Sequence, residues 1–248
     1  MNRRLPAILL WACTLASCRA PARDLTVFAA ASLREAMADL ADAYAAQHPG
    51  CHVTLQFAGS QELRTQLQHG ALADVIATAD EASMATLVAD GVAHAPDALT
   101  CNTPVVALAI DVTTGLQFND LPQLDRIVLG TPDVPIGRYA DEILARADPA
   151  FAAAVRAHVV SREANARQVL AKVTLGEAQA AIVYRTDALA AGANVRTLAV
   201  PSALGVVARY RIAAGNGPLQ TDAAAFVALA RSAVGQSALA RRGFVACP

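Results

Sequence analysis

Short apolar runs alternate with helical patterns along most of this chain, and no other feature of the sequence limits the possible folds as strongly. Each run has four to eight residues, which is the length of a strand, and stretches with helical periodicity separate successive runs. This alternation predicts an α/β protein with mostly parallel sheets. The expected strands are Leu25 to Ala31, Val53 to Phe57, Asp74 to Ala79, Val105 to Ile110, Arg126 to Gly130, Ala180 to Tyr184 and Val206 to Ala213.

The clearest helical pattern begins at Ser32 and ends near His48-Pro49-Gly50. Its spacing predicts one apolar helix face made of Leu33, Met37, Leu40, Ala41 and Tyr44. A chain of 248 residues can form one domain or two small ones, and the pattern alone does not choose between them. Further helices are expected from Ser60 to His69-Gly70, from about Asp80 to Asp90-Gly91, and from starts near Pro135, Pro149, Asn165, Thr186 and Thr221.

The N-terminal segment is typical of an export signal. An apolar stretch from Leu5 to Ala16 follows Arg3 and Arg4, and it is shorter than the roughly 20 residues of a membrane anchor. Cleavage after Ala20-Pro21-Ala22 is one possibility, which would make residues 1–22 the signal peptide. We favour Leu15-Ala16-Ser17-Cys18, which resembles a bacterial lipobox, so that 1–17 are the signal, Cys18 carries a lipid and 18–24 form a linker. Either reading predicts a periplasmic protein.

The charge argues against nucleic acid as a partner. The formal net charge is −1, and removal of Arg3 and Arg4 with the leader takes it to −3. A nucleic-acid-binding protein usually carries a basic surface instead. Bulk charge therefore does not attract the ligand of this protein.

The cysteines and histidines predict neither a complete disulfide framework nor a metal site. Cys51, Cys101 and Cys247 remain after cleavage, which allows one bridge and one free thiol in any pairing. The five histidines form no spacing typical of metal ligands. We expect no bound metal cation and no cofactor.

Two of the expected helices begin with a serine directly after a strand and small residues. Ser32 follows Val27-Phe28-Ala29-Ala30-Ala31, and Ser60 follows Phe57-Ala58-Gly59. The strand ends of an α/β sheet face a ligand crevice, so these helix starts are candidate binding positions. Ser32 also has Glu35 three residues later, so it has the alternative interpretation of a helix N-cap in a capping box.

Six motifs in order along the chain resemble the family of molybdate-binding proteins of bacterial ABC importers. They are Val27 to Leu33, Phe57 to Ser60, Ala73 to Asp80, Val134 to Ala140, Asn165 to Gln168 and Ala181 to Tyr184. The resemblance implies a type II periplasmic binding-protein fold, in which two α/β lobes are joined by crossovers, here near Thr103 to Ile110 and Leu204 to Ile212. Lobe I would hold 25–103 and 205–248, and lobe II 104–204. It also implies a monomer that delivers its ligand to a membrane permease.

The resemblance also implies the ligand shell. Ser32 and Ser60 would donate through hydroxyl and backbone N–H groups, Ile136 and Ala166 through backbone N–H groups, and Tyr184 through its phenol. Ile136 departs from the small residue usual in the family, which leaves the shape of the cleft open there. Departures outside the shell are Gln61, Leu72 and Arg211, and Ala166 replaces a frequent valine while keeping its amide.

Physical chemistry is consistent with an oxyanion ligand. Helix N-termini offer free N–H groups and partial positive charge, so about seven charge-assisted hydrogen bonds can hold a dianion without a charged side chain. Because the shell contains only donors, the proton of hydrogen phosphate would be buried without an acceptor. Tungstate and sulfate are proton-free like molybdate, so only cleft size can separate the three.

Several alternatives remain at this point. The ligand could be another oxyanion or a small organic anion such as sulfate or a phosphonate, since a fold does not determine its ligand. An enzyme is disfavoured because no nucleophile-elbow, P-loop or zinc-protease motif is present. Arg34, Arg138 and Arg167 lie in first helical turns and are expected to be solvated. Asp74 and Asp80 are expected to cap helices.

Overall fold

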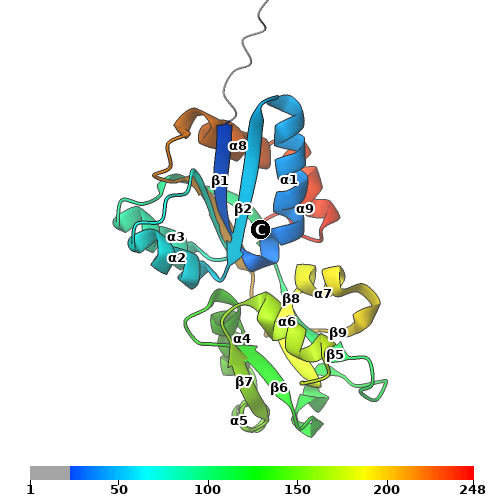
Figure 1. Ribbon diagram of the computed structural model, residues 1–248. Helices are drawn as coiled ribbons and strands as arrows, with labels where there is room; N and C mark the ends of the chain where they lie inside the picture. Colours follow the sequence, from blue (N-terminus) through cyan, green and yellow to red (C-terminus); the bar gives the residue numbers. More distant parts are fainter. Residues whose placement is uncertain (1–22) are drawn as a thin grey trace, which may run out of the picture.

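The computed structural model describes residues 23–248, which form two α/β lobes connected by two extended segments (Figure 1). The leader and Cys18 lie outside the described residues. Lobe I is built on a sheet with the strand order β2 (Cys51–Ala58), β1 (Arg23–Ala30), β3 (Val75–Thr78), β10 (Ala208–Ala214) and β4 (His94–Asn102). Lobe II is built on a sheet with the order β7 (Val159–Glu163), β6 (Ile127–Gly130), β8 (Ala180–Tyr184), β5 (Pro104–Ala109) and β9 (Val195–Ala199).

The predicted two-lobed α/β fold is confirmed, but the sheets are mixed rather than mostly parallel. In lobe I, β1 pairs with β2 and β3 in parallel, whereas β10 pairs with β3 and β4 antiparallel. Lobe II repeats this arrangement, with β6 parallel to β7 and β8, and β5 antiparallel to β8 and β9. The antiparallel pairings involve the strands next to the crossovers, whose direction is set by the path between lobes and not by local sequence.

The apolar pattern accounts for the central strands and the helices that cover them. All residues of β3, β6 and β8 are buried, as expected for strands covered on both faces. In lobe I, a 3-10 turn η1 (Ala31–Leu33) leads into α1 (Arg34–Gln47), which packs with α8 (Gln220–Arg231) and α9 (Ala233–Arg241). The predicted apolar face of α1 is confirmed, since its Met37, Leu40 and Tyr44 are fully buried. The helices α2 (Ser60–Gln68) and α3 (Glu81–Ala89) pack together over a second cluster of buried side chains.

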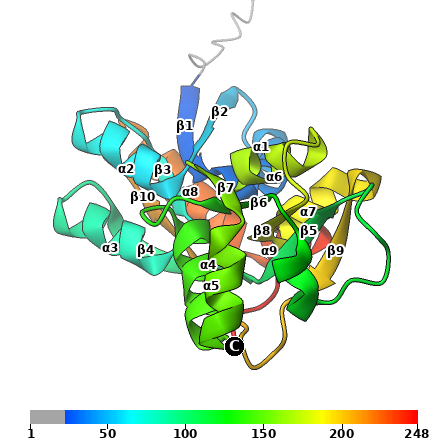
Figure 2. The same cartoon turned by 90° about the horizontal axis from the view of Figure 1, so that it is seen from below.

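The helices of lobe II form two pairs on opposite sides of its sheet (Figure 2). One pair is α4 (Pro135–Arg146) with α5 (Pro149–Ala157), and the other is α6 (Ala166–Thr174) with α7 (Arg185–Ala191). Two short 3-10 segments, η2 (Phe118–Gln123) and η3 (Gly192–Asn194), complete the described secondary structure. In the described part of the chain no single helix is long and apolar enough to cross a membrane. Only α8 and α9 counted together, across a bend of 62°, reach that length and apolar composition.

The chain passes between the lobes at two places. Thr103 alone separates β4 from β5, so these two strands are one nearly continuous extended segment. Residues 200–207 return the chain from β9 to β10. β1 begins at Arg23, so the last two residues of the expected linker belong to the sheet.

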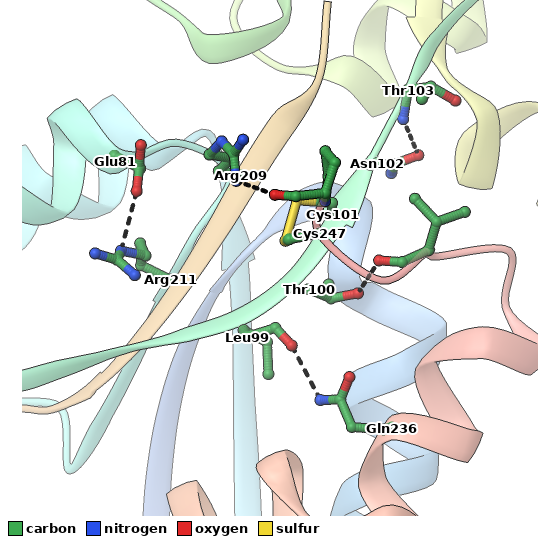
Figure 3. The surroundings of a disulfide bond; sticks show 12 residues. Glu81, Leu99, Thr100, Cys101, Asn102, Thr103, Arg209, Arg211, Gln236 and Cys247 are labelled. Carbon is green, nitrogen blue, oxygen red and sulfur yellow. Dashed lines mark hydrogen bonds and ion pairs between the residues drawn. A yellow bond between two sulfur atoms is a disulfide. The ribbon is translucent and has the colours of Figure 1, made fainter.

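A disulfide joins Cys101, one residue before the end of β4, to Cys247 near the C-terminus (Figure 3). Backbone hydrogen bonds between Cys101 and Val245 lie beside it. Among the described residues Cys51 is the free cysteine; it is buried, and burial raises the pKa of its thiol. The bridge therefore holds the C-terminal segment against lobe I, and Cys51 is poorly placed to exchange with it.

Reduction of this disulfide is expected to lower the stability of lobe I. The bridged cysteines are 146 residues apart, and a loop of this length predicts a loss of about 2–5 kcal/mol in the free energy of unfolding. The melting temperature should fall by roughly 5–15 °C, measured by circular dichroism with and without reductant. Cys247→Ser should melt at the lower temperature in both conditions. A wild-type melting temperature that is the same with and without reductant would show that the bridge does not contribute to stability.

Candidate functional site

A small cavity between the lobes is lined almost entirely by residues at which a strand gives way to a helix. From lobe I it receives residues 30–32 between β1 and α1, residues 58–60 between β2 and α2, and Ala79 between β3 and α3. From lobe II it receives residues 134–136 at the start of α4, residues 165–166 at the start of α6, and Tyr184 before α7. The first N–H groups of each such helix lack an intrahelical acceptor, so the cavity is surrounded by potential donors.

The structure brings all five predicted site residues together around this cavity. Ser32, Ser60, Ile136, Ala166 and Tyr184 all line it, and each is at least 96% buried. Its lining contains no Asp, Glu, Lys or Arg. Its volume of about 20 Å³ is far below the roughly 300 Å³ of a site for a drug-sized ligand. The arrangement can therefore hold a ligand of a few atoms through neutral donors.

Tyr184 has a buried hydroxyl with no hydrogen-bond partner among the described residues. The side chain is 2% exposed and lies at the end of β8, beside the rings of Tyr139 and Tyr210. Burial raises the pKa of Tyr184 well above its usual value, so the phenol keeps its proton. A buried donor without a partner costs stability, and an anion in the cavity would remove that cost.

Ser60 begins α2, and its hydroxyl oxygen accepts the N–H of Ala79 at 3.0 Å. Gly59 precedes it as the N-cap in extended backbone, and a Cβ on Gly59 would lie 2.6 Å from the carbonyl oxygen of Ala164 in lobe II. The side chain of Gln61 donates to the same carbonyl at 2.8 Å. The absence of a side chain at Gly59 therefore allows the two lobes to approach at the edge of the cavity.

The alternative role of Ser32 as a helix cap is not what the structure shows. Ser32 lies inside η1, and neither η1 nor α1 has a side-chain cap. Its Oγ instead lies 2.8 Å from the hydroxyl of Tyr210 on β10. The long-range contact with Tyr210 has replaced the local cap, which leaves the serine hydroxyl at the cavity wall.

The departure at Ile136 is accommodated by glycines. Ile136 is 1% exposed, and a Cβ on Gly130 would lie 2.9 Å from its Cγ2 atom. A Cβ on Gly137 would lie 1.9 Å from the carbonyl oxygen of Thr131. Gly130 therefore makes room for the isoleucine, and Gly137 lets the first turn of α4 pack tightly against the end of β6.

Arg138 and Arg167 are not free surface residues as expected: their side chains remain 39% and 23% exposed, but both form ion pairs across the cleft. Arg138 of α4 pairs with Asp80, which also caps α3 as predicted by accepting the N–H of Ser83 at 2.8 Å. Arg167 of α6 pairs with Glu35 of α1 in the other lobe. Local sequence marks these arginines only as first-turn residues, and their partners are far away in the chain.

The two remaining expectations for charged residues have mixed outcomes. Arg34 is exposed, as predicted, and its guanidinium lies 4.5 Å from the ring centroid of Phe57. Asp74 caps no helix that follows it directly; it accepts the backbone N–H of Thr26 and that of Leu219, the N-cap residue of α8, both at 2.8 Å, so it acts as a long-range cap. Within residues 23–248, no three His, Cys, Asp or Glu side chains gather in a group that could hold a metal ion.

Arg167 also contacts a buried carboxylate in its own lobe. Its Nε lies 2.8 Å from Oδ1 of Asp187, which is fully buried in α7. Burial raises the pKa of Asp187 from 3.8 to about 6, although Arg167 opposes the shift. The folded chain thus binds this proton more tightly than the unfolded chain, so the cost of burying the charge is present above pH 6 and disappears toward pH 3.8.

Loss of the contact between the lobes at Glu35 is expected to weaken ligand binding modestly. Glu35→Gln removes the partner of Arg167 on lobe I, and a part-exposed ion pair contributes about 0.2–1 kcal/mol, or roughly 1.5- to 5-fold in affinity. The matched control is Glu142→Gln, whose partner Arg146 lies in the same helix. Titration calorimetry at low and high salt should show a salt-sensitive loss for Glu35→Gln only. Equal affinities for both variants would mean that the pair does not support the closed lobes.

Comparison with known proteins identifies the family to which this chain belongs. Residues 25–245 match the family model described as bacterial extracellular solute-binding protein. The molybdate-binding protein ModA of Mycobacterium tuberculosis H37Rv is 38% identical over 228 residues, covering 90% of this chain and 85% of that protein. Among solved structures, the periplasmic molybdate-binding protein of Azotobacter vinelandii has a TM-score of 0.80 at 17% identity, covering 90% of this chain and all of that one.

The fold is shared with proteins named for other anions. The sulfate-binding protein SubI of Mycobacterium tuberculosis H37Rv also has a TM-score of 0.80, at 18% identity, covering 90% of this chain and 86% of that one. The likeness to these two solved structures therefore establishes the architecture and not the ligand. Because the family model spans nearly all the described residues and the resemblance seen in six short motifs is confirmed at 38% identity, the chain belongs to the bacterial extracellular solute-binding proteins.

Proposed function

We propose that this protein captures molybdate, and equally tungstate, in the cavity between its lobes and delivers it to the membrane permease of an ABC importer. The observation that carries the proposal is a cavity of about 20 Å³ lined by helix starts, two serines and a tyrosine, with no charged side chain. Such a site suits a compact, fully ionised anion. The name of its 38% identical relative supports the same ligand.

The lining contains no carboxylate to accept a proton, which also supports rejection of phosphate. Hydrogen phosphate carries a proton at neutral pH, and a buried donor without an acceptor costs about 1–3 kcal/mol. Molybdate, tungstate and sulfate carry no proton, so cavity size must separate sulfate from the two larger ions. The small volume also disfavours an organic anion.

Calorimetric titration with molybdate, tungstate, sulfate and phosphate on one metal-free preparation tests the proposal. We expect tight binding of molybdate and tungstate, weaker binding of sulfate and little binding of phosphate. Sulfate binding that exceeds molybdate binding would replace the proposed ligand with sulfate. Failure of all four would remove the oxyanion assignment.

Tyr184→Phe is expected to separate binding from stability. The variant loses a hydroxyl that has no partner among residues 23–248, so the ligand-free protein should melt at the same or a higher temperature. Molybdate affinity should fall by about 10-fold or more, because a hydrogen bond to a charged group contributes about 1.5–3 kcal/mol. Unchanged affinity would take the phenol out of the ligand shell.

The second part of the proposal concerns location. The sequence Leu15-Ala16-Ser17-Cys18 supports a lipid on Cys18 that tethers a periplasmic protein to the membrane. Palmitate labelling in the native host, with Cys18→Ser as the control, tests this. A soluble, unlabelled product that begins at Arg23 would show cleavage after Ala22 instead.

A further inference from the structure

The two serines of the cavity differ in how their hydroxyl hydrogens are directed. The Oγ of Ser60 accepts from a backbone N–H, which can only donate, so the Ser60 hydrogen is free to point at a ligand. The Oγ of Ser32 lies 2.8 Å from the hydroxyl of Tyr210, and either group could donate. If Ser32 donated to Tyr210, its lone pairs would face the cavity and would repel an anion.

The side chain of Asn102 presents a donor to the other side of the Tyr210 hydroxyl contact. Asn102 ends β4, and its side chain is fully buried. Its Oδ1 accepts the backbone N–H of Thr103 at 2.9 Å (Figure 3). Its Nδ2 then faces Oγ1 of Thr186 at 2.9 Å and the hydroxyl of Tyr210 at 3.5 Å. A flipped amide would place two donors against each other at Thr103, so the NH₂ group must face Tyr210.

Tyr210 transmits this direction to Ser32. Tyr210 is fully buried, and burial raises its pKa, so the phenol keeps its hydrogen. Asn102 approaches the Tyr210 oxygen with a donor and cannot accept, so of these two neighbours only Ser32 can accept the hydrogen of the phenol. The Ser32 oxygen then accepts, and its hydrogen is left for the cavity.

We infer that Asn102 and Tyr210 are positioning residues that orient the Ser32 hydroxyl as an obligatory donor and thereby select against oxyanions that carry a proton. The chain of hydrogen bonds runs from Asn102 to Tyr210, from Tyr210 to Ser32, and from Ser32 into the cavity. With Ser60 held by the N–H of Ala79, each serine oxygen already accepts one hydrogen bond from the protein and directs its hydrogen to the cavity, so both hydroxyls meet the ligand as donors. The inference rests on the proposed function, since it concerns discrimination between molybdate and hydrogen phosphate in that cavity.

The test is the reversal of the chain by Asn102→Asp. A carboxylate has the same shape but only accepts, so Tyr210 would donate to it, Ser32 would donate to Tyr210, and a lone pair of Ser32 would face the ligand. We expect molybdate and sulfate to lose about 10-fold or more in affinity in parallel, while hydrogen phosphate does not lose affinity. Competition titrations at pH 8 measure the selectivity ratio, which is the phosphate dissociation constant divided by the molybdate dissociation constant. This ratio should fall by about 10-fold.

Two further variants keep the inference testable if Asn102→Asp does not fold. Tyr210→Phe retains the ring that packs against Tyr184 and Phe244 but frees the Ser32 hydroxyl to rotate. The selectivity ratio of phosphate to molybdate dissociation constants should therefore fall by about 2- to 10-fold. Thr186→Val removes only the other partner of the Asn102 amide and should leave the ratio unchanged.

The outcomes separate this inference from the proposed function. Wild-type protein that binds no molybdate would remove the proposed function. Wild-type binding together with an unchanged ratio in every folded variant of Asn102 and Tyr210 would remove the inference alone. An equal fall of the selectivity ratio in Thr186→Val would also overturn the inference, because a general loss of packing around Asn102 would then explain the effect.

Discussion

Gly59→Ala is expected to weaken molybdate binding by about 5- to 150-fold while both lobes remain folded. The backbone of Gly59 has φ −64° and ψ 146°, which alanine adopts without strain. The added Cβ would lie 2.6 Å from the carbonyl oxygen of Ala164 in the opposite lobe. The Cβ would also lie 2.5 Å from Oε1 of Gln61 in the same lobe, but that side-chain end can rotate away, whereas the Ala164 carbonyl is backbone. Overpacking against this carbonyl costs about 1–3 kcal/mol, and the open form does not bear this cost.

Small-angle scattering and calorimetry together check this result. Wild-type protein should become more compact when molybdate binds, whereas Gly59→Ala should stay extended at ligand concentrations that close the wild type. The matched control is Gly205→Ala, where the nearest atom to the new Cβ is 3.3 Å away and belongs to the same segment. A fully compact, tightly binding Gly59→Ala protein would contradict a role for this glycine in closure.

Ser60→Ala is the second variant with a large expected effect, and it should reduce both affinity and stability. Removal of a hydroxyl that donates to a dianion is expected to lower molybdate affinity by about 10- to 150-fold. The buried N–H of Ala79 also loses its acceptor, which should cost about 1–3 kcal/mol in the free energy of unfolding. Ser32→Ala should lower affinity similarly, and it should also cost about 1–3 kcal/mol in the free energy of unfolding, because the buried Tyr210 hydroxyl loses the acceptor of its hydrogen.

The control for the serine variants is Ser83→Ala, which removes a hydroxyl that is equally buried but lies in α3 outside the cavity lining. Calorimetry should show wild-type affinity for this variant, and thermal unfolding reports the stability of all three. If Ser32→Ala and Ser60→Ala both bind molybdate like the wild type, the hydroxyls do not belong to the ligand shell.

These predictions share one physical basis. The cavity holds no counter-charge, so its attraction for an anion depends on the direction of each N–H and O–H dipole. Changes that move donors apart, as at Gly59, or delete one, as at Ser60, should therefore have larger effects than loss of a surface ion pair at Glu35.

Local sequence was sufficient for the elements with strong apolar patterns. The strands β1, β2, β3, β5, β6, β8 and β10 were all predicted within a few residues of their bounds. The strands β4, β7 and β9 were not predicted, because they are partly exposed and carry no continuous apolar run. Helix α9 was also missed, since the pattern after Thr221 does not show that the helix is interrupted at Ser232.

Pairings between distant residues could not be derived from the chain. Three cysteines allowed any pairing, and only the folded protein places Cys247 beside Cys101. The sequence identifies Arg138 and Arg167 only as first-turn residues, because nothing near them in the chain indicates Asp80 or Glu35 as a partner.

The sequence by itself determined that two strands end in small residues and that a serine follows each of them at the start of a helix. These features depend on neighbouring residues, which set strand length, helix starts and backbone freedom. Only the tertiary structure decided that Ser32 and Ser60 lie around one cavity with Ile136, Ala166 and Tyr184. It likewise decided that Asn102 and Tyr210 direct the Ser32 hydroxyl. Such contacts join residues up to 178 positions apart, and their geometry is set by the packing of whole lobes.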